Sequence, residues 1–480
     1  MKVKRTKLLR IICLGLVILM MLPLVMACKD DEGDDTGDGV TISNDDQYLD
    51  DLGEYDFGGS EFRVLSVESK EGTYTLFDID TYNDSILDRS IYTRNREIEQ
   101  RFNMKFVAET ESAYDKCTEA LTLQVSGGEH NYDLIELINR RAYVAAISGN
   151  IMSVSSLPCL DTTKDYYLQD INKMCSLNGK MFLAYSDLSI YTFQRAACLA
   201  FNKNMASDNQ IADLYSMVEN NTWTYEEMYK LARQVATKDG DGNVTTYGMY
   251  GQGDYMCTTI YLAAGENIIE NNNGKLEFNI GKNEKMDTLT KQFLAEIDAG
   301  NIGYELNYKD ETWNDEFTSG MALFNGTVIG KLFLLRDISD FDYGVLPWPK
   351  YEATQESYYS RVIDAWLHVA PITCPNAEKT SVIMEALASG SSKHVFPAYY
   401  ENALTGQVVR DYQSVDMLEL IRANRVFDWG DVTWSETIRV PMLNHVFGSR
   451  KFTLATLYAS VGKQVNGLIQ EAYDGAKKIN

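Results

Sequence analysis

Short hydrophobic runs alternate with amphipathic segments along most of this 480-residue chain. The run SEFRVLSVES, at 60–69, has apolar side chains at alternating positions, which predicts a β-strand. The segment SILDRSIYTRNREIEQRF, at 85–102, repeats isoleucine at helical intervals and predicts an α-helix. Two more strands are predicted in MKFVAE at 104–109 and in NYDLIELI at 131–138. Strands that alternate with helices favour an α/β domain with a largely parallel sheet.

A helix followed by a tight turn is predicted near the middle of the chain. In TWTYEEMYKLARQV, Thr224 and Glu227 have the spacing of a capping box. The sequence DGDGN that follows places oxygen-bearing side chains at Asp239, Asp241 and Asn243. A calcium loop also needs a glycine at its sixth position and a carboxylate at its twelfth, where this chain has valine and tyrosine. We therefore predict a turn, with calcium binding as the alternative.

The C-terminal part contains three segments with helical periodicity. They are NAEKTSVIMEALAS at 376–389, SVDMLELIRANRVFDW at 414–429, and an apolar-periodic run from Leu454 to Ala472. Neither charge nor composition indicates a linker between Glu61 and the C-terminus. If the chain folds into two lobes, we expect it to cross between them more than once.

The N-terminus has the layout of a signal sequence. Five basic residues in MKVKRTKLLR precede an uncharged stretch from Ile11 to Ala27 and then Cys28. The sequence LPLVMAC is similar to a bacterial lipoprotein signal, which implies that 1–27 is a signal peptide, cleaved before Cys28, and that lipid is attached to the Cys28 sulfur. Two acyl chains would anchor the protein stably at the extracellular face of the cell membrane. An uncleaved membrane anchor is the alternative, because the apolar run is close to the minimum length of a span.

An acidic segment follows the cysteine. Twelve acidic residues stand against Lys29 alone in KDDEGDDTGDGVTISNDDQYLDDLGEYD, which has few large apolar groups. Such a composition cannot bury enough surface to fold, so we predict a disordered tether at 28–55. The whole chain has a formal net charge of -25, which makes nucleic acid an unfavourable partner.

The cysteines and histidines indicate no metal site and no cofactor. Cys13 and Cys28 lie in the N-terminal segment, no C-x-x-C pair occurs, and the four histidines are far apart in sequence. We predict buried thiols, with disulfides as an alternative because the protein would be outside the cytoplasm. The six cysteines concerned are Cys117, Cys159, Cys175, Cys198, Cys257 and Cys374.

Four segments occur in an order that is similar to one family of receptors. NGKMFLAYSDLSIYTFQRAACLAFNKNM contains a Gly-Lys turn, a strand and FNK where the family usually has YNK. NTWTYEEMYKLARQVATKDGDGNVTTYGMYG contains a Thr-Trp helix, a turn and a Tyr-Gly strand; FTSGMALFNGTVIG and FDYGVLPWPK follow. Together they resemble the extracellular solute-binding proteins of ABC importers, in the carbohydrate-binding group (family 1), over roughly residues 60 to 465.

The resemblance implies a fold as well as a function. The fold is α/β and periplasmic-binding-protein-like, type II, with two α/β lobes, crossing hinge strands and a ligand cleft that closes by a hinge. Lobe one would hold residues 56–190 and 367–408. Lobe two would hold residues 191–366 and 409–480.

The ligand site that the resemblance implies combines rings with polar groups. A neutral sugar offers apolar C–H faces and hydroxyls, so its receptor needs aromatic side chains together with carboxylates, amides or arginine. Tyr255, with Asp254 beside it, stands where relatives open a helix toward the cleft. Asp364 and Trp366 stand just before a strand that crosses between the lobes, where the family lines its cleft.

Five more positions are candidates for the same cleft. Asp187 and Arg140 are placed similarly on lobe one, and Thr327 stands where relatives often have a tryptophan. Glu68, at the end of the first strand, and Trp434, in the C-terminal part, are further candidates. Helix capping, surface exposure and core packing are the alternatives for all of these residues.

The resemblance therefore predicts a monomeric, lipid-anchored receptor that passes a carbohydrate to ABC permease subunits, without catalysis. A secreted acidic glycoside hydrolase is one alternative, since it would need two carboxylates that face a scissile bond and this chain has many acids. No Gly-x-Ser-x-Gly, phosphate-loop or His-Glu-x-x-His motif occurs. A surface glycan-binding lipoprotein without a transporter is the other alternative.

Overall fold

In the computed structural model, Tyr48–Asn480 form one compact unit. The signal peptide, Cys28 and most of the acidic tether lie outside the described residues, so the predictions for them stay predictions. Within the described part, no helix has the length and hydropathy needed to cross a membrane. The residues that the structure describes are 48–68, 77–79, 85–306, 315–338, 340–400, 409 and 411–478.

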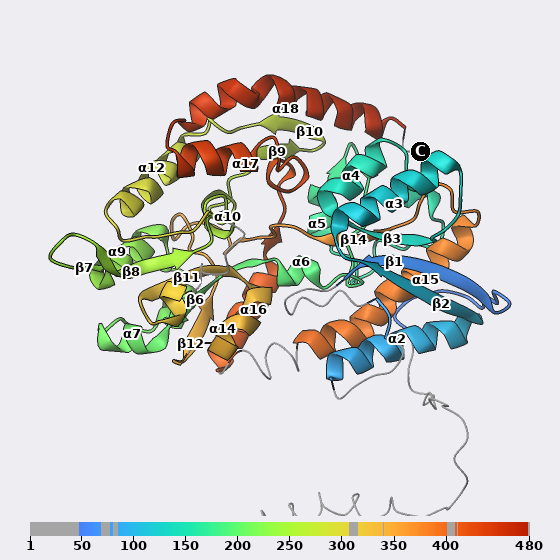
Figure 1. Ribbon diagram of the computed structural model, residues 1–480, viewed down its shortest axis with the longest axis horizontal. Coiled ribbons are helices and arrows are strands. Elements are labelled where there is room, and N and C mark those ends of the chain that lie inside the picture. Colours follow the sequence, from blue (N-terminus) through green and yellow to red (C-terminus); the bar gives the residue numbers. More distant parts are fainter. Residues whose placement is uncertain are drawn as a thin grey trace, which may run out of the picture. The chain divides into compact units, whose positions relative to one another are not determined.

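One four-stranded sheet organises the first half of the fold, which we call lobe one (Figure 1). Its strand order is β14-β3-β1-β2; β1 pairs in parallel with β2 and β3, and β14 pairs antiparallel with β3. Its strands are β1 (Ser60–Val67), β2 (Met104–Glu111), β3 (Leu134–Ile138) and β14 (Trp366–Val369). Its helices include α2 (Ile86–Phe102), α3 (Tyr114–Gly127), α4 (Asn139–Ile147) and α15 (Ala377–Gly390). The strands and the helix predicted from the first hydrophobic runs are confirmed.

A five-stranded sheet organises the second half, lobe two, in the order β12-β6-β11-β8-β7. Only β11 and β8 pair in parallel here, whereas the largely parallel sheet was predicted from the strands of lobe one, where β1 does pair in parallel with β2 and β3. At one edge of the lobe-two sheet a short turn joins β7 to β8 and permits only antiparallel pairing. The strands are β6 (Ala197–Asn202), β7 (Thr237–Lys238), β8 (Val244–Gly251), β11 (Ala322–Val328) and β12 (Tyr343–Leu346).

The helix and turn predicted near residue 240 are confirmed. Helix α9 (Tyr225–Val235) begins after Thr224, whose hydroxyl accepts a hydrogen bond from the backbone N–H of Glu227 at 3.4 Å. In the turn between β7 and β8, the Asp239 carboxylate accepts the backbone N–H groups of Asp241 and Asn243, both at 2.9 Å. These bonds hold the pKa of Asp239 below its usual value, the side-chain bond from Asn243 having the largest effect. The carboxylate thus has a structural role in the turn, and calcium binding stays untested.

Three chain segments lie side by side where the lobes are joined, and we call them the crossing segments. They are the chain around Arg195, residues 360–363 and residues 425–426. The backbone N–H of Ile363 donates to the carbonyl of Arg195 at 3.1 Å, and that of Val362 donates to Val426 at 3.0 Å. Strand β13 (Ser360–Arg361) pairs in parallel with β15 (Arg425–Val426). The chain therefore crosses between the lobes more than once, as predicted.

The remaining elements complete both lobes. The helices are α5 (Gln169–Met174), α6 (Tyr191–Gln194), α7 (Lys203–Asp208), α8 (Leu214–Glu219), α10 (Gly253–Met256), α11 (Thr259–Leu262), α12 (Glu284–Asp298), α13 (Asp315–Thr318), α14 (Leu332–Ile338), α16 (Tyr412–Ala423), α17 (Arg439–Pro441) and α18 (Leu454–Ala476). Shorter helical turns are η2 (Val154–Ser156), η4 (Ile329–Lys331), η5 (Ser391–Val395), η7 (Trp429–Thr433) and η8 (Met442–Gly448). Two hairpins are β4 (Ser176–Leu177) with β5 (Lys180–Met181), and β9 (Ile269–Asn272) with β10 (Lys275–Phe278).

Close packing explains the glycine of the motif FDYGVLPWP, which contains β12. A Cβ atom added to Gly344 would lie 2.1 Å from Tyr215 Oη and 2.3 Å from the Phe201 ring. The tryptophan that follows, Trp348, is fully buried, and Pro347 accepts a hydrogen bond from Trp223 Nε1 at 3.0 Å. Much of the aromatic content of this lobe is therefore core.

The cysteines of the described residues are all free thiols. Cys117, Cys198, Cys257 and Cys374 are buried. Burial raises the pKa of Cys117 and of Cys374 to about 12, so both stay protonated at neutral pH. The prediction of buried thiols holds for these four, and no disulfide forms among the six cysteines that the structure describes.

Candidate functional site

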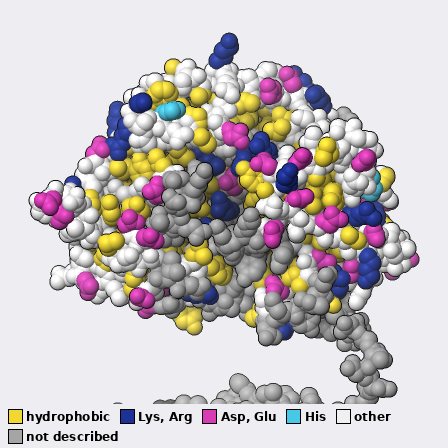
Figure 2. All heavy atoms as spheres, in the orientation of Figure 1, with side chains coloured by type: hydrophobic (Ala, Val, Ile, Leu, Met, Phe, Trp, Pro, Cys, Tyr) yellow, Lys and Arg dark blue, Asp and Glu magenta, His cyan; other side chains and the backbone are white. Residues whose placement is uncertain are grey.

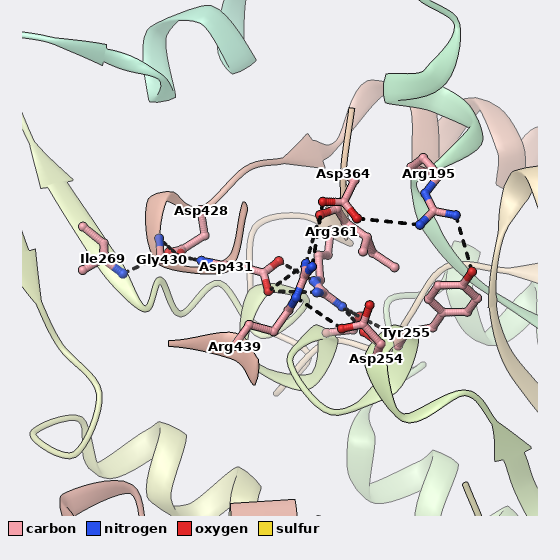
Figure 3. Close-up of polar contacts among 12 residues, drawn as sticks. Arg195, Asp254, Tyr255, Ile269, Arg361, Asp364, Asp428, Gly430, Asp431 and Arg439 are labelled. Carbon is pink, nitrogen blue, oxygen red and sulfur yellow. Dashed lines mark hydrogen bonds and ion pairs between the residues drawn. The ribbon is translucent and has the colours of Figure 1, made fainter. Parts of the chain in front are cut away.

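Asp364 lies at the centre of a network of charged side chains next to the crossing segments (Figure 3). Arg140, in the first turn of α4, donates from Nη1 to Asp364 Oδ1 at 3.1 Å. Arg195 Nη2 lies 3.8 Å from Asp364 Oδ2, and Arg439 Nη2 lies 3.8 Å from Oδ1. One carboxylate therefore receives guanidinium groups from α4, from the residue that follows α6 and from α17. The network joins both lobes.

Arg361 and Asp431 form a second, fully buried pair beside this network. Arg361 donates from Nε and Nη2 to the two Asp431 oxygens at 2.5 and 2.8 Å, which is a bidentate arrangement. Its Nη1 also donates to the backbone carbonyl of Asp254 at 2.6 Å and to Thr259 Oγ1 at 3.3 Å. Both side chains of the pair are 0% exposed. The pair thus fixes the start of α10 against the crossing segment.

Asp254 and Tyr255 extend the network from α10. Arg439 Nε lies 3.2 Å from Asp254 Oδ1, so Arg439 contacts both Asp254 and Asp364. Arg195 Nη1 donates to Tyr255 Oη at 3.4 Å, and its guanidinium carbon lies 5.6 Å from the Tyr255 ring centroid. Tyr255 is only 5% exposed, so most of its ring is covered in this conformation.

Aromatic rings border the charged network on the lobe-one side. The Trp366 ring centroid lies 5.8 Å from that of Tyr114, at the start of α3, and 5.8 Å from that of Tyr191, at the start of α6. The Tyr114 ring also lies 5.1 Å below the guanidinium of Arg140. The pairing of Trp366 with Ile138 across β14 and β3 brings Trp366 close to Arg140. Figure 2 shows charged side chains gathered near the middle of one face, among hydrophobic ones.

Burial and neighbouring charges shift the pKa values in this region. Burial alone would lower the pKa of Arg195, but the adjacent Tyr255 hydroxyl and the Asp364 carboxylate outweigh it and raise that pKa. Asp428 caps the turn that contains Asp431 by accepting the backbone N–H groups of Gly430 and Asp431 at 2.7 and 2.9 Å. Burial, and then the charge of Asp431, raise the pKa of Asp428 to about 7.

The structure places five predicted site residues in this network or at its border. They are Arg140, Asp254, Tyr255, Asp364 and Trp366. The prediction omitted four charged residues that hold the network together. These are Arg195, Arg361, Asp431 and Arg439. One sequence signal could have indicated two of them. Arg195 and Arg361 stand directly before apolar runs, at positions where a strand begins and a polar side chain can face a site.

Two predicted residues on lobe one lie in other surroundings. Burial raises the pKa of Asp187 despite a side-chain hydrogen bond from Ser392 and the charges of Arg425, in β15, and Arg422. Glu68, directly after β1, is exposed. Their contribution to ligand binding stays a prediction.

Thr327 and Trp434 are buried rather than presented to solvent. Thr327 is 0% exposed in the middle of the sheet of lobe two, and its neighbour Val328 is the residue that packs against Tyr255. The Trp434 ring lies 5.7 Å from that of Trp429 and 6.5 Å from that of Tyr143. These contacts fit the core-packing alternative for Trp434.

One group of potential metal ligands forms on lobe one although the sequence gives no metal motif. His130, Asp133 and Cys374 place their ligand atoms within 4.8 Å of one another. Each is already bonded, because Asp133 accepts from His130 and from the backbone N–H of Arg63, and the Cys374 thiol donates to the Asp133 carbonyl. We assign no metal to this group.

Comparison with known proteins gives the fold. No family model matches the sequence, and no curated protein sequence matches it. Among solved structures, a cyclo/maltodextrin-binding protein complexed with maltotetraose is similar with a TM-score of 0.61 and 15% identity, over 88% of this chain and 99% of that chain. The ABC substrate-binding protein Lmo0181 from Listeria monocytogenes, in complex with cycloalternan, gives 0.56 and 13%, over 86% and 99%.

A third solved structure binds a different kind of solute. UgpB from Mycobacterium tuberculosis, in complex with glycerophosphocholine, gives a TM-score of 0.53 and 14% identity, over 87% of this chain and 99% of that chain. At these identities the likeness establishes the fold and nothing finer. This chain has the two-lobed, periplasmic-binding-protein-like α/β fold that the sequence predicted.

Proposed function

We propose that this protein is a receptor that captures a carbohydrate, an oligosaccharide in particular, and delivers it to an ABC importer. The observation that carries the proposal is the network around Asp364, where arginines from both lobes meet beside the ring of Trp366. Two of the similar structures hold oligosaccharides, and a two-lobed fold with polar and aromatic groups at its junction suits such a ligand.

The chemistry of these residues fits a sugar. The carboxylates of Asp254 and Asp364 accept hydrogen bonds from hydroxyls, and guanidinium groups donate to hydroxyl and ring oxygens. The Trp366 ring, together with Tyr255 once the lobes separate, offers a surface for C–H faces. Asp187 and Glu68 would take part only in contacts outside this network, whereas Thr327 and Trp434, which are buried, would support the site through packing.

The rest of the proposal concerns where the protein works. Cleavage before Cys28 and acylation of its sulfur would anchor a monomer at the extracellular face of the membrane, and the acidic segment would hold the lobes away from the bilayer. The domain boundaries proposed above assign residues 56–190 and 367–408 to lobe one, and 191–366 and 409–480 to lobe two. The permease subunits would then dock on the two lobes.

Catalysis is the less favoured function for this site. A glycoside hydrolase needs one of its two carboxyl groups as a proton donor near the scissile bond. Here Asp254 and Asp364 both lie against guanidinium groups, at 3.2 and 3.1 Å. Carboxylate oxygens that face N–H groups are positioned to accept hydrogen bonds.

A ligand screen tests the proposed function. Maltotetraose, cycloalternan and a panel of other saccharides would be added to the purified protein, because a ligand that binds the native state raises the melting temperature. We expect at least one saccharide to raise it and to be recovered unchanged. A panel without any shift, or the appearance of cleaved sugar, would contradict the proposal. Separately, Cys28→Ser should release the protein from the membrane fraction; unchanged membrane retention would contradict the anchor.

A further inference from the structure

We propose that the captured saccharide carries an anionic group, which binds to the N–H groups of Arg140 and Arg195 that Asp364 leaves unused. This inference rests on the proposed function and narrows its substrate class. It uses the guanidinium groups of the network as the recognition element, and the aromatic rings beside them as the surface for the sugar ring. A uronate carboxylate and a sulfate ester share the required chemistry.

The first argument is the balance of charge around the site. The chain as a whole has a net charge of -25, yet the described network contains four arginines and three aspartates. Asp428 caps the adjoining turn, and its carboxyl is only partly ionised at neutral pH because its pKa is raised to about 7. The local excess of positive charge therefore stands out from an acidic molecule. The residues of the network are Arg140, Arg195, Arg361, Arg439, Asp254, Asp364 and Asp431.

The second argument is that two of the arginines hold incomplete sets of partners. Arg361 makes four hydrogen bonds, two of them to the Asp431 carboxylate. Arg140 makes one side-chain hydrogen bond, to Asp364, and its buried Nε has no hydrogen-bond partner. Arg195 makes one long hydrogen bond of 3.4 Å to a hydroxyl and an ion pair at 3.8 Å. The buried Nε of Arg140 is a costly donor to leave without a partner, and Arg195 has only long contacts, so a ligand that supplies oxygens is favoured beside these two side chains.

The third argument is access. The side chains of Arg140 and Arg195 are 15% and 20% exposed, whereas those of Arg361 and Arg439 are 0% and 7% exposed. The two incompletely bonded arginines are therefore also the two that a ligand can reach. Both approach the same carboxylate, Asp364, one at each oxygen, which places the two guanidinium groups on opposite sides of one acceptor.

These features together favour an anion over a hydroxyl. A hydroxyl oxygen can accept one N–H from either guanidinium but leaves the excess charge in a largely buried site. A carboxylate or sulfate accepts several N–H groups and balances the charge, and such charge-assisted hydrogen bonds are about twice as strong as neutral ones. Tyr114, below Arg140, and Trp366 beside it then cover the sugar ring.

Binding calorimetry on matched saccharides tests the inference. The probes are maltotetraose, tetragalacturonate and a sulfated maltotetraose, measured at low and high NaCl concentration. We expect at least one anionic probe to bind at least tenfold more tightly than maltotetraose, with an affinity that falls as salt rises. Comparison of tetragalacturonate with sulfated maltotetraose shows whether the site prefers a carboxylate or a sulfate ester.

Variants show whether the two arginines are responsible. Arg140→Gln and Arg195→Gln should each weaken the anionic probe tenfold or more while changing maltotetraose affinity much less. Arg63→Gln is the matched control, because Arg63 is exposed on β1 and pairs with Glu61. Circular dichroism and the melting temperature would confirm that each variant is folded.

The outcomes distinguish this inference from the proposed function. Equal or tighter binding of maltotetraose overturns the anionic preference and leaves a carbohydrate receptor. Anion binding that is unaffected by both arginine variants overturns the assigned site. If the folded protein binds none of these probes and no saccharide of the wider panel, both the inference and the proposed function fail.

Discussion

Two arginine–aspartate groups lie next to each other in this protein and differ in how completely they are bonded. Arg361 and Asp431 are bidentate, with both side chains 0% exposed. Arg140 meets Asp364 through one hydrogen bond of 3.1 Å, with side chains that are 15% and 12% exposed. The same two residue types thus form a saturated pair and an unsaturated one.

This difference indicates that the Arg361–Asp431 pair stabilises the fold and that the Arg140–Asp364 pair is available to a ligand. A buried pair whose partners are all present is costly to break, because the remaining charge has no water to replace the lost partner. An incompletely bonded pair near solvent keeps donors for another molecule, and its loss costs the fold less, because Arg195 and Arg439 still approach Asp364. Variants of each pair, and of the residues next to them, test this contrast between Arg361 and Arg140.

Removing one half of the saturated pair should have the largest effect. Arg361→Met leaves Asp431 buried, with Arg439 Nη1 at 3.7 Å as its remaining cation. We expect a loss of about 3–5 kcal/mol in the free energy of unfolding. Denaturant unfolding of Arg361→Met and of wild type measures it. A loss below about 1 kcal/mol would show that this pair is no more important to the fold than an exposed one.

The pH dependence of stability should report on the same buried region. The pKa of Asp428 is raised from 3.8 to about 7, so between these values the folded state binds a proton that the unfolded state has lost. The contribution of Asp428 is therefore fully favourable below pH 3.8 and declines as the pH rises toward 7, by at most about 1.4 kcal/mol per pH unit.

The matched variant isolates this contribution. Asp428→Asn keeps an oxygen for the Gly430 and Asp431 N–H groups but cannot titrate. Unfolding free energies measured from pH 4 to pH 8 should decline less steeply with rising pH in Asp428→Asn than in wild type. Parallel curves for the two proteins would show that Asp428 is ionised throughout and that the turn is stabilised differently.

Ligand binding should depend on the residues around the Arg140–Asp364 pair, and Trp366 is the aromatic residue among them. Trp366 packs against Tyr114 and Tyr191 and is partly exposed, so truncation to alanine removes ring surface without opening the core. We expect about tenfold weaker binding, or about 1.4 kcal/mol, for the saccharide with the largest thermal shift in the screen. Calorimetry with Trp366→Ala measures it, and wild-type affinity would place the site elsewhere.

The smallest effect on stability is expected for Arg140. Arg140→Gln removes one hydrogen bond to Asp364, while Arg195 and Arg439 still approach that carboxylate. The free energy of unfolding should change by less than about 1 kcal/mol. Chemical denaturation of Arg140→Gln beside Arg361→Met makes the comparison direct, and equal losses would abolish the distinction between the two groups.

Local sequence patterns predicted the elements of this fold well. The alternation in SEFRVLSVES corresponds to β1, and the capping box at Thr224 and Glu227 begins α9. These features depend on residues a few positions apart, which is the range over which periodicity and capping act. The mixed pairing of the lobe-two sheet depends on how distant strands meet, as β6 and β11 do across more than a hundred residues, and the sequence carried no such signal.

The candidate site was predicted in part for the same reason. The family resemblance predicted Asp364, Trp366 and Tyr255 as site residues, but of the arginines that contact Asp364 the prediction included only Arg140. Arg195 is more than 160 residues from Asp364, and no spacing links the two. On β11 the prediction chose Thr327, whereas the alternation of side chains along the strand directs Val328 toward Tyr255.

The hydrogen bonds between the crossing segments determine which parts of the site move when the lobes do. Ile363 bonds to Arg195 across these segments, and Asp364 is the next residue along the chain. This bond ties the backbone of Arg195 to that of the residue before Asp364. The two side chains therefore stay near each other for as long as the crossing segments remain hydrogen-bonded, whatever the more distant parts of either lobe do.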